Sequence, residues 1–227
     1  MAVGLIGTGR MGRALAVRLA DTADLYLFDR DADRLKTVGE ELKLPVVESM
    51  EELVKLGTVI LAVPDQEVIS CIKDFNQQPQ TLQVINIATN VDSQVLRQTS
   101  ARHIRCINAK FVSQADEMLL GQRPVIIVDE QPSDMVSVAA ELFAAMGDIV
   151  VGRADLVTAI NKSAAENVLT AAVHLEETLR QKNVTDPRLI KAAIRQVAVG
   201  TLKAYADSNL GPFAREIVRS VRARLKK

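Results

Sequence analysis

Cysteine is scarce in this chain of 227 residues. Its two cysteines, Cys71 and Cys106, lie far apart in sequence and lack the CxxC spacing of zinc and redox sites. Each stands in an apolar stretch, which is typical of a buried, reduced thiol. The sequence therefore predicts neither a disulfide nor a metal site.

An excess of charge of either sign is also missing, because 28 Lys and Arg residues balance 28 Asp and Glu residues. Proteins that bind a duplex neutralise its phosphates with a basic surface, so we expect no nucleic-acid partner. Residues 218–227, VRSVRARLKK, are a local basic exception. Cations in the last turns of a helix interact favourably with the helix dipole, which explains such a tail.

Long apolar runs are absent as well, and none approaches the roughly 20 residues of a membrane-spanning helix. The first residues lead directly into a strand pattern, without the features of a signal peptide. Apolar residues make up 48% and charged residues 25%, as in ordinary globular proteins that build a sizeable core. We therefore expect a cytoplasmic protein with no membrane partner.

Strand-like runs alternate with helical patterns over residues 1–152. The run 58–64 is apolar throughout, as in a strand that is buried on both faces of a parallel sheet. Strands that alternate with helices of about 10 to 15 residues predict an α/β fold with a doubly wound parallel sheet. The predicted strands cover residues 2–6, 25–29, 45–48, 58–64, 83–88, 104–109, 124–129 and 148–152.

Three positions are suited to begin helices within this region. Asp31 precedes a pattern of apolar residues spaced by three and four, and Ser49 with Glu52 has the spacing of a capping box. A further helix is expected to be capped near Ser133 and to run to Gly147. These caps set the boundaries of the helices between the strands.

The strand signal stops at Ala154, and three helices are predicted at residues 155–182, 187–206 and 212–225. The second and third carry single apolar stripes, and Tyr205 on such a stripe is expected to be a core residue. A helical domain of residues 153–227 is thin by itself. We therefore expect it to pack against a second copy of the chain, as a homodimer.

A glycine-rich turn lies between the first strand and the first helix, where a phosphate-binding loop is expected. Its glycines permit a tight turn, a close approach of a pyrophosphate to the backbone and close packing of the helix on the strand. With an acidic residue, Asp29, after the second strand, the pattern predicts a dinucleotide-binding domain. The turn consists of Gly7, Thr8, Gly9, Arg10, Met11 and Gly12.

The choice between NAD and NADP stays open at this point. The carboxylate of Asp29 is suited to accept the ribose hydroxyls of NAD, and it would repel the additional phosphate of NADP. Arg30 follows immediately, with Arg34 and Lys36 close by, and a guanidinium suits a 2′-phosphate. We expect NADP or NAD as the cofactor.

Six segments along the chain resemble pyrroline-5-carboxylate reductases, in both order and spacing. The resemblance implies a Rossmann domain followed by a helical domain that dimerises. It also implies hydride transfer from NADPH or NADH to a cyclic imine that bears a carboxylate, as in proline biosynthesis. The segments are GLIGTGRMGRAL, VILAVPDQEV, VINIATNVDSQVL, RCINAKF, DLVTAINKSAAENVLTAAVHLEETL and AVGTLKAYADSNLGPFAREIV.

The chain also departs from that family. Residues 161–165, NKSAA, stand where the family has a Ser-Gly-rich stretch with a proline. Residues 215–227 stand in place of the Ser-Pro-Gly-Gly-Thr-Thr loop that contacts the substrate, and the prolines expected after RCINA are missing from residues 110–121. The resemblance therefore implies the fold and the cofactor site more directly than the substrate.

Lys162 on the first predicted C-terminal helix resembles the lysine that assists hydride transfer in the related β-hydroxyacid dehydrogenases. Asn167 resembles the asparagine that supports this lysine, although it lies five residues further on instead of four. Ser163 is a further catalytic candidate. As an alternative, Glu166 pairs with Lys162 on an exposed helix face, which contributes about 0.3–0.5 kcal/mol.

The ends of two other predicted strands contribute to the expected site. Asn86 with Ala88, Thr89 and Asn90 follows the fifth strand and is expected beside the nicotinamide. Lys110, placed in the loop after RCINA, is either an anchor for a substrate carboxylate or a surface lysine. At the end of the fourth strand, Ala62, Val63, Pro64 and Asp65 are expected to border the adenosine and pyrophosphate.

These observations leave three hypotheses. The first is an NAD(P)H-dependent reductase of a small imine or carbonyl compound. The second is a hydroxyacid-type dehydrogenase that uses Lys162 as acid and base, so that loss of Lys162 abolishes turnover. The third is a protein without catalytic activity that senses the redox state of the dinucleotide and reports it through its helices.

Overall fold

The computed structural model describes residues 1–226, and the chain forms two compact units. The first is Met1–Lys162, and the second begins at Ser163. The long helix α8 (Leu156–Gln181) begins in the first unit and continues into the second. Its first turns belong to the first unit because Ala154 and Val157 pack with Ile127 of the sheet.

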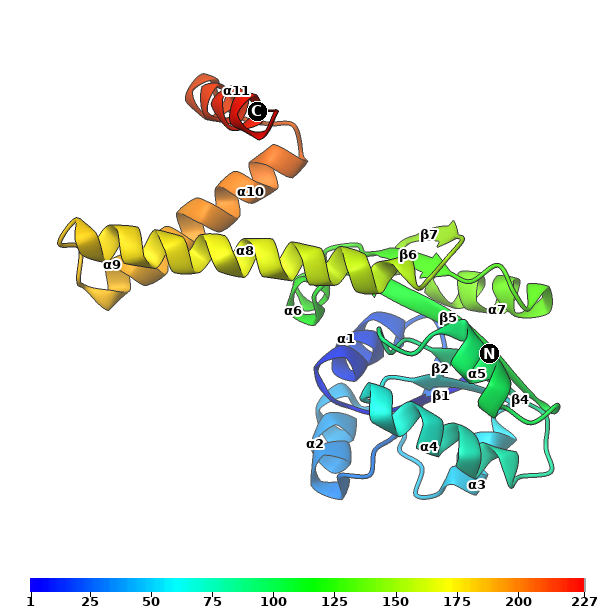
Figure 1. Cartoon of the computed structure of the whole chain (residues 1–227). Coiled ribbons are helices and arrows are strands. Elements are labelled where there is room, and N and C mark those ends of the chain that lie inside the picture. The colour runs from blue at the N-terminus through cyan, green and yellow to red at the C-terminus, as the bar shows by residue number, and fades with distance from the viewer. Residues whose placement is uncertain (227) are drawn as a thin grey trace. The chain divides into compact units, whose positions relative to one another are not determined.

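The first unit is built around a seven-stranded sheet with the strand order β2-β1-β3-β4-β5-β6-β7. The α/β fold with a Rossmann-like sheet is confirmed, and Figure 1 shows the helices that lie around the strands. The strands are β1 (Ala2–Ile6), β2 (Asp24–Phe28), β3 (Thr58–Leu61), β4 (Leu82–Asn86), β5 (Ile104–Val112), β6 (Val125–Val128) and β7 (Asp148–Val151).

One strand pair departs from the predicted parallel sheet, because β5 and β6 pair antiparallel. The connection between them contains one short helix, α6 (Ala115–Leu119). A helix of this length does not carry the chain across the face of the sheet, so β6 runs back along β5. The segment 45–48 is also not a full strand, because it forms only an isolated bridge between Val46 and Leu27.

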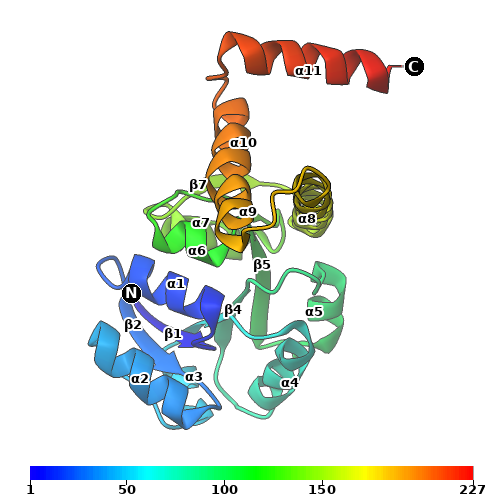
Figure 2. The same cartoon turned by 90° about the vertical axis from the view of Figure 1, so that its left-hand side faces the viewer.

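Helices cover both faces of the sheet. The buried side chains of α1, α2 and α7 belong to one core cluster, and those of α3, α4 and α5 belong to another. Figure 2 shows the helices on either side of the strands. The bounds are α1 (Arg10–Leu19), α2 (Ala32–Leu42), α3 (Met50–Lys55), α4 (Asp65–Asn76), α5 (Ser93–Thr99) and α7 (Ser133–Phe143).

The predicted caps differ in outcome. The side chain of Asp31 accepts a hydrogen bond from the backbone N–H of Arg34, at 3.0 Å. Ser49 accepts one from the N–H of Glu52 at 3.3 Å, as expected for a capping box. The cap near Ser133 is wrong, because Pro132 precedes the helix and no side chain caps it.

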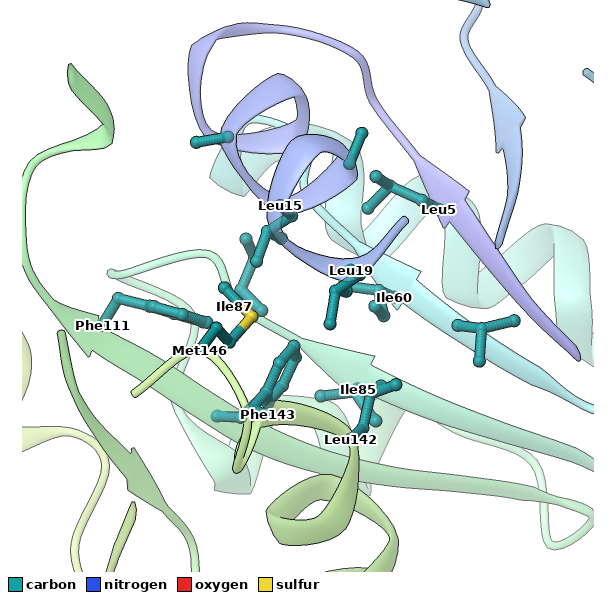
Figure 3. Close-up of a cluster of buried hydrophobic side chains, with 14 of the residues drawn as sticks. Leu5, Leu15, Leu19, Ile60, Ile85, Ile87, Phe111, Leu142, Phe143 and Met146 are labelled. Atoms are coloured by element: carbon teal, nitrogen blue, oxygen red, sulfur yellow. The ribbon is translucent and has the colours of Figure 1, made fainter. Parts of the chain in front are cut away.

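Aliphatic side chains of the central strands meet those of α1 and α7 in a continuous core (Figure 3). Leu19 from α1 lies beside Ile60 of β3, and Leu142 from α7 lies beside Ile85 of β4. This core fixes α1, and with it the glycine turn that precedes it. Phe111 and Phe143 add an edge-to-face ring contact, with their ring centroids 5.3 Å apart.

The second unit is helical throughout, as predicted. Its predicted middle helix is interrupted by a π-helix over Ala193–Ala198, which the apolar pattern did not indicate. Within residues 163–226, Ile190 is the only buried hydrophobic residue, and the expectation that Tyr205 is a core residue is wrong because it is 48% exposed. The helices after α8 are α9 (Pro187–Ala192), α10 (Val199–Ala206) and α11 (Pro212–Leu225).

The helices formed by residues 1–226 are all too short or too polar to cross a membrane.

Candidate functional site

The carboxyl ends of β1, β3 and β4 lie side by side in the first unit. The strand register pairs Ile6 with Leu61 and Leu61 with Asn86. The segments that follow these residues therefore meet at one edge of the sheet. β1 lies between β2 and β3, so the chain reverses its direction of travel across the sheet here, and ligands bind at such switch points in open α/β sheets.

The glycine turn has the shape that a phosphate cradle requires. Gly7 has a φ of +94°, and a Cβ atom on Gly7 would overlap the carbonyl of Ala62. A Cβ atom on Gly12 would overlap the carbonyl oxygen of Gly7, so α1 lies directly against the turn. At Gly9, by contrast, a Cβ atom would meet nothing within 4 Å. Open space therefore lies in front of the central glycine.

The amino end of α1 can bind an anion in that space. Gly9 is the N-cap residue, no side chain caps the helix, and its first turn has no acidic residue. The first N–H groups of the helix consequently have no intrahelical partner, and the helix dipole favours negative charge there. This arrangement fits the pyrophosphate of a dinucleotide.

Asp29 lies buried behind the glycine turn. One oxygen, Oδ2, accepts hydrogen bonds from the N–H and hydroxyl of Thr8, at 2.6 and 2.8 Å, and from Nε of Arg34 at 3.1 Å. The other, Oδ1, accepts from the N–H of Asp31 at 2.9 Å and from Arg34 at 2.7 Å. Burial alone would raise the pKa of Asp29, but the hydrogen bonds from Arg34, Thr8 and Asp31 lower it to about 2.

These contacts give Asp29 an internal role. A carboxylate has about four lone-pair sites, and five donor contacts from the protein already occupy them. Asp29 therefore joins the glycine turn, through Thr8, to the start of α2, through Asp31 and Arg34. The sequence indicated the acidic residue itself, but nothing in the spacing indicated that Thr8 and Arg34 would bind it.

Arg30 extends from the end of β2 toward α4. Its guanidinium lies 3.7 Å from carboxylate oxygens of Glu67 and Asp74, and it donates to the hydroxyl of Ser70 at 3.3 Å. These two ion pairs are long, and the side chains that form them are exposed to solvent. Contacts of this kind exchange readily for a better anionic partner.

A cleft of about 350 Å³ connects the glycine turn with Arg30 and α4. Cys71 forms part of its wall, and burial raises the pKa of this thiol to about 11, so it stays protonated. A larger apolar pocket of about 690 Å³ lies between α2 and residues 43–48, and it does not include the glycine turn. The lining of the cleft includes Gly7, Gly9, Asp29, Arg30, Arg34, Ala62, Val63 and Pro64.

Side-chain hydrogen bonds fix the segment that follows β4. Asn86 is fully buried, donates to Asn108 Oδ1 at 2.7 Å and accepts from the N–H of Ala88 at 3.2 Å. Asn90 donates through Nδ2 to Asp65 of α4 at 2.7 Å. Ala88, Thr89 and Asn90 thus form a fixed turn at the same edge of the sheet as the glycine turn. They follow the fourth strand of the structure. It is the fifth of the predicted strands, because these include residues 45–48.

The first turns of α8 are attached to the same edge of the sheet. Thr158 donates through its hydroxyl to the carbonyl oxygen of Thr89 at 2.6 Å. Asn161 donates through Nδ2 to the carbonyl oxygen of Phe111 at 2.9 Å. Neither residue was indicated as part of the site by the sequence, because both contacts depend on where the helix meets the sheet. Lys162 follows Thr158 by one turn, so both lie on the same helix face.

The three catalytic candidates of the sequence lie together on α8. Lys162, Ser163 and Asn167 are all exposed in the single chain. Asn167 donates through Nδ2 to the backbone carbonyl of Ser163 at 2.8 Å, a contact within the helix. Lys162 is linked to the turn at Thr89 through Thr158, which lies one helical turn before it.

The position of Lys110 differs from the loop position that the sequence predicted. It lies within β5 and not in a loop, because β5 continues to Val112, where it pairs with β6. Its side chain is 1% exposed, and its Nζ donates to Asp155 at 2.7 Å, just before α8 begins. Lys110 is therefore a buried cation that holds the start of α8 and is not a surface lysine.

Part of the chain matches a family model. Residues 2–90 match the family described as NADP oxidoreductase, coenzyme F420-dependent. This part contains the glycine turn, the cleft and the turn after β4. No match was found among curated protein sequences.

Solved structures with the same fold cover nearly the whole chain. A pyrroline-5-carboxylate reductase from Coxiella burnetii matches with a TM-score of 0.71 and 16% identity over 96% of this chain and 84% of its own. A pyrroline carboxylate reductase from Plasmodium falciparum with NADP bound matches with a TM-score of 0.68 and 18% identity, over 99% and 90% of the two chains.

Enzymes that act on other substrates share this fold. A reductive aminase from Aspergillus terreus, in complex with NADPH and ethyl-5-oxohexanoate, matches with a TM-score of 0.66 and 16% identity, over 91% of this chain and 76% of its own. The chain therefore has the fold of the pyrroline-5-carboxylate reductases and of the reductive aminases, with an N-terminal part similar to NADP oxidoreductases.

Proposed function

We propose that this protein is an NAD(P)H-dependent reductase of a small imine or carbonyl compound, and that a cyclic imine such as pyrroline-5-carboxylate is its substrate. One observation carries the proposal. The glycine turn presents open space at Gly9, in front of an uncapped helix end, within a fold shared with imine-reducing enzymes.

Different residues around the cradle bind different parts of the dinucleotide. The N–H groups at the start of α1 bind the pyrophosphate, while Ala62, Val63 and Pro64 border the cleft beside it. The fixed turn of Ala88, Thr89 and Asn90 orients the nicotinamide at the end of β4. A bound nicotinamide cofactor supplies the hydride that reduces the C=N or C=O carbon of the substrate.

The surroundings of Asp29 support NADP in preference to NAD. The five donor contacts to Asp29 leave its carboxylate little capacity to accept ribose hydroxyls. Arg30, in contrast, is held only by long contacts with Glu67 and Asp74. We expect it to leave these acids for a 2′-phosphate, for which a guanidinium is well suited.

Lys162 supports a second candidate, the hydroxyacid-type dehydrogenase. Its helix is attached to Thr89 through Thr158, one turn before Lys162. A lysine in this position can donate a proton to the oxygen or nitrogen of the substrate as hydride reaches the carbon. In imine reduction this proton can come from solvent instead, because the imine nitrogen is already basic.

The protein is proposed to act as a homodimer through its C-terminal helices. The second unit leaves many apolar side chains exposed in the single chain, on α8, α10 and α11. The residues at 215–227 that replace the family's substrate loop leave the exact substrate open to alternatives within this class.

The function is tested by NADPH oxidation with pyrroline-5-carboxylate, other cyclic imines and 2-oxo acids, for the natural chain and for Lys162→Met. Imine reduction with a proton from solvent predicts that Lys162→Met keeps most of its turnover. Acid–base catalysis by Lys162 predicts a loss of about 100-fold or more in kcat, with unchanged affinity for NADPH. If NADPH binds but no compound is turned over, the reductase proposal is wrong.

A further inference from the structure

A pocket of about 480 Å³ lies within the second unit, between the end of α10 and the face of α11. Figure 1 shows these two helices joined by a short connection, in orange and red. The pocket shares no lining residue with the cleft at the glycine turn. It is lined by Tyr205, Ala206, Ser208, Leu210, Arg215, Val218, Arg219 and Arg222.

Three arginines line one side of this pocket. Arg215, Arg219 and Arg222 are spaced by four and three residues, so they share one face of α11. Arg222 donates to the hydroxyl oxygen of Tyr205 at 3.2 Å, which turns the phenol toward the arginines. Among residues 1–226, no acidic side chain forms an ion pair with any of the three.

The helix dipole does not explain this arrangement. Cations stabilise the last turn of a helix, where Arg222 and Arg224 lie, but Arg215 lies near the amino end of α11. The first turn of that helix contains no acidic residue that would balance it. Like charges four residues apart, such as Arg215 and Arg219, also repel each other. An anion at this face of α11 would therefore reduce the repulsion between the arginines.

The chemistry of the lining defines the class of ligand. Guanidinium groups bind carboxylates and phosphates through paired hydrogen bonds. The hydroxyl of Tyr205 accepts from Arg222 and keeps its own proton to donate, and Ser208 contributes a second hydroxyl. Ala206, Leu210 and Val218 form an apolar wall that suits the carbon skeleton of a small molecule.

We propose that this pocket is a binding site for a small organic anion, one that carries a phosphate or carboxylate group. Arg215 and Arg219 bind the anionic group, and Arg222 with Tyr205 closes the site on the α10 side. None of these residues belongs to the lining of the cleft at the glycine turn.

Isothermal titration of the full chain with inorganic phosphate and with citrate, at constant ionic strength, tests this site. The matched variants are Arg219→Gln in the pocket and Arg224→Gln outside it on the same helix. We expect saturable binding by the natural chain, weakened about tenfold or more by Arg219→Gln and within about twofold of the natural value for Arg224→Gln. Circular dichroism and NADPH binding verify that both variants are folded.

Two results would overturn the proposal. Equal weakening by both variants would mean that general positive charge attracts the anion, without a built site. Saturable binding of a nucleic-acid duplex, with no binding of phosphate or citrate, would mean that α11 is a surface for a macromolecule. Citrate bound more tightly than phosphate assigns the site to carboxylates, and the reverse order assigns it to phosphates.

Discussion

At the scale of single residues, Asp29 is the centre of the proposed cofactor site. It is 8% exposed, and its bonds to Thr8 and Arg34 connect the glycine turn with the start of α2. A buried carboxylate with charge-assisted bonds of this kind is fixed in the ionised state. The residue therefore stabilises the shape of the glycine turn, and we expect it to contribute little to direct recognition of a ribose.

Asp29→Asn is expected to reduce stability in a manner that depends on pH. The pKa of Asp29 is lowered from 3.8 to about 2, so the folded chain favours its ionised form. The resulting stabilisation, about 2 kcal/mol, is complete above about pH 4 and is lost as the pH falls through about 2. Urea unfolding at pH 7 and at pH 3 measures the effect.

The control for this experiment is Asp33→Asn, an exposed carboxyl in the first turn of α2. The gap between the natural chain and Asp29→Asn should narrow as the pH is lowered. A gap of the same size at both pH values would show that the hydrogen bonds matter and the ionisation does not.

Arg30→Gln is expected to change the choice of cofactor. If this guanidinium binds the 2′-phosphate, the variant loses about tenfold or more in NADPH affinity and keeps its NADH affinity. Fluorescence titration with both nucleotides measures the two dissociation constants. Glu67→Gln serves as the counterpart, because removal of a competing acid should strengthen NADPH binding. Equal losses for both nucleotides in Arg30→Gln would contradict this role.

At the scale of elements, α8 connects the sheet with the catalytic candidates. Three contacts hold its beginning: Thr158 with Thr89, Asn161 with Phe111, and Lys110 with Asp155 just before the helix. The helix therefore starts from a fixed position at the edge of the sheet. Lys162 receives its place relative to the turn after β4 from these contacts.

Thr158→Val tests this attachment. The change removes the hydroxyl that donates to Thr89 while it keeps the volume of the side chain, and we expect a loss of about 1 kcal/mol in stability. We also expect turnover to fall, and by more than this loss of stability alone would cause. The reason is that the turn after β4 and α8 would lose their mutual position. Thermal unfolding and steady-state kinetics measure the two effects.

Thr170→Val is the matched control on the same helix, because Thr170 donates only to the carbonyl of Glu166 within the helix. It should leave turnover and stability nearly unchanged. If the two variants behave alike, the contact between Thr158 and Thr89 does not position the site.

The elements that the sequence predicted correctly are those decided locally. The glycine turn depends on the backbone freedom of Gly7 and the close packing at Gly12, and the caps at Asp31 and Ser49 depend on neighbouring N–H groups. Lys110 was misplaced because the length of β5 is decided by its partner β6, which is distant in sequence. The contact of Asp29 with Thr8 and that of Thr158 with Thr89 could not be predicted from spacing for the same reason.

At the scale of the whole molecule, the second unit differs from the first in how little of it is buried. Ile190 is its only buried hydrophobic residue within residues 163–226. A unit with so little buried apolar surface does not balance the conformational entropy of its ordered helices. A second copy is the simplest source of the missing contacts.

Sedimentation velocity is expected to give a dimer at micromolar concentration, and Leu169→Glu is expected to dissociate it. Leu169 is 64% exposed on α8 in the single chain, with Val173 one turn further on. Val95→Glu, an exposed apolar position on the sheet unit, is the control and should leave the dimer intact. A monomeric natural chain at this concentration would contradict the proposed assembly.

The most direct measurement is the fate of the hydride itself. The protein is incubated with pyrroline-5-carboxylate and with NADPH that carries deuterium at both C4 positions, and the product is analysed by mass spectrometry. The account predicts a product that carries one deuterium on the former imine carbon, formed only in the presence of the protein. An unlabelled or absent product, together with demonstrated binding of NADPH, would contradict the assignment as a reductase of this imine.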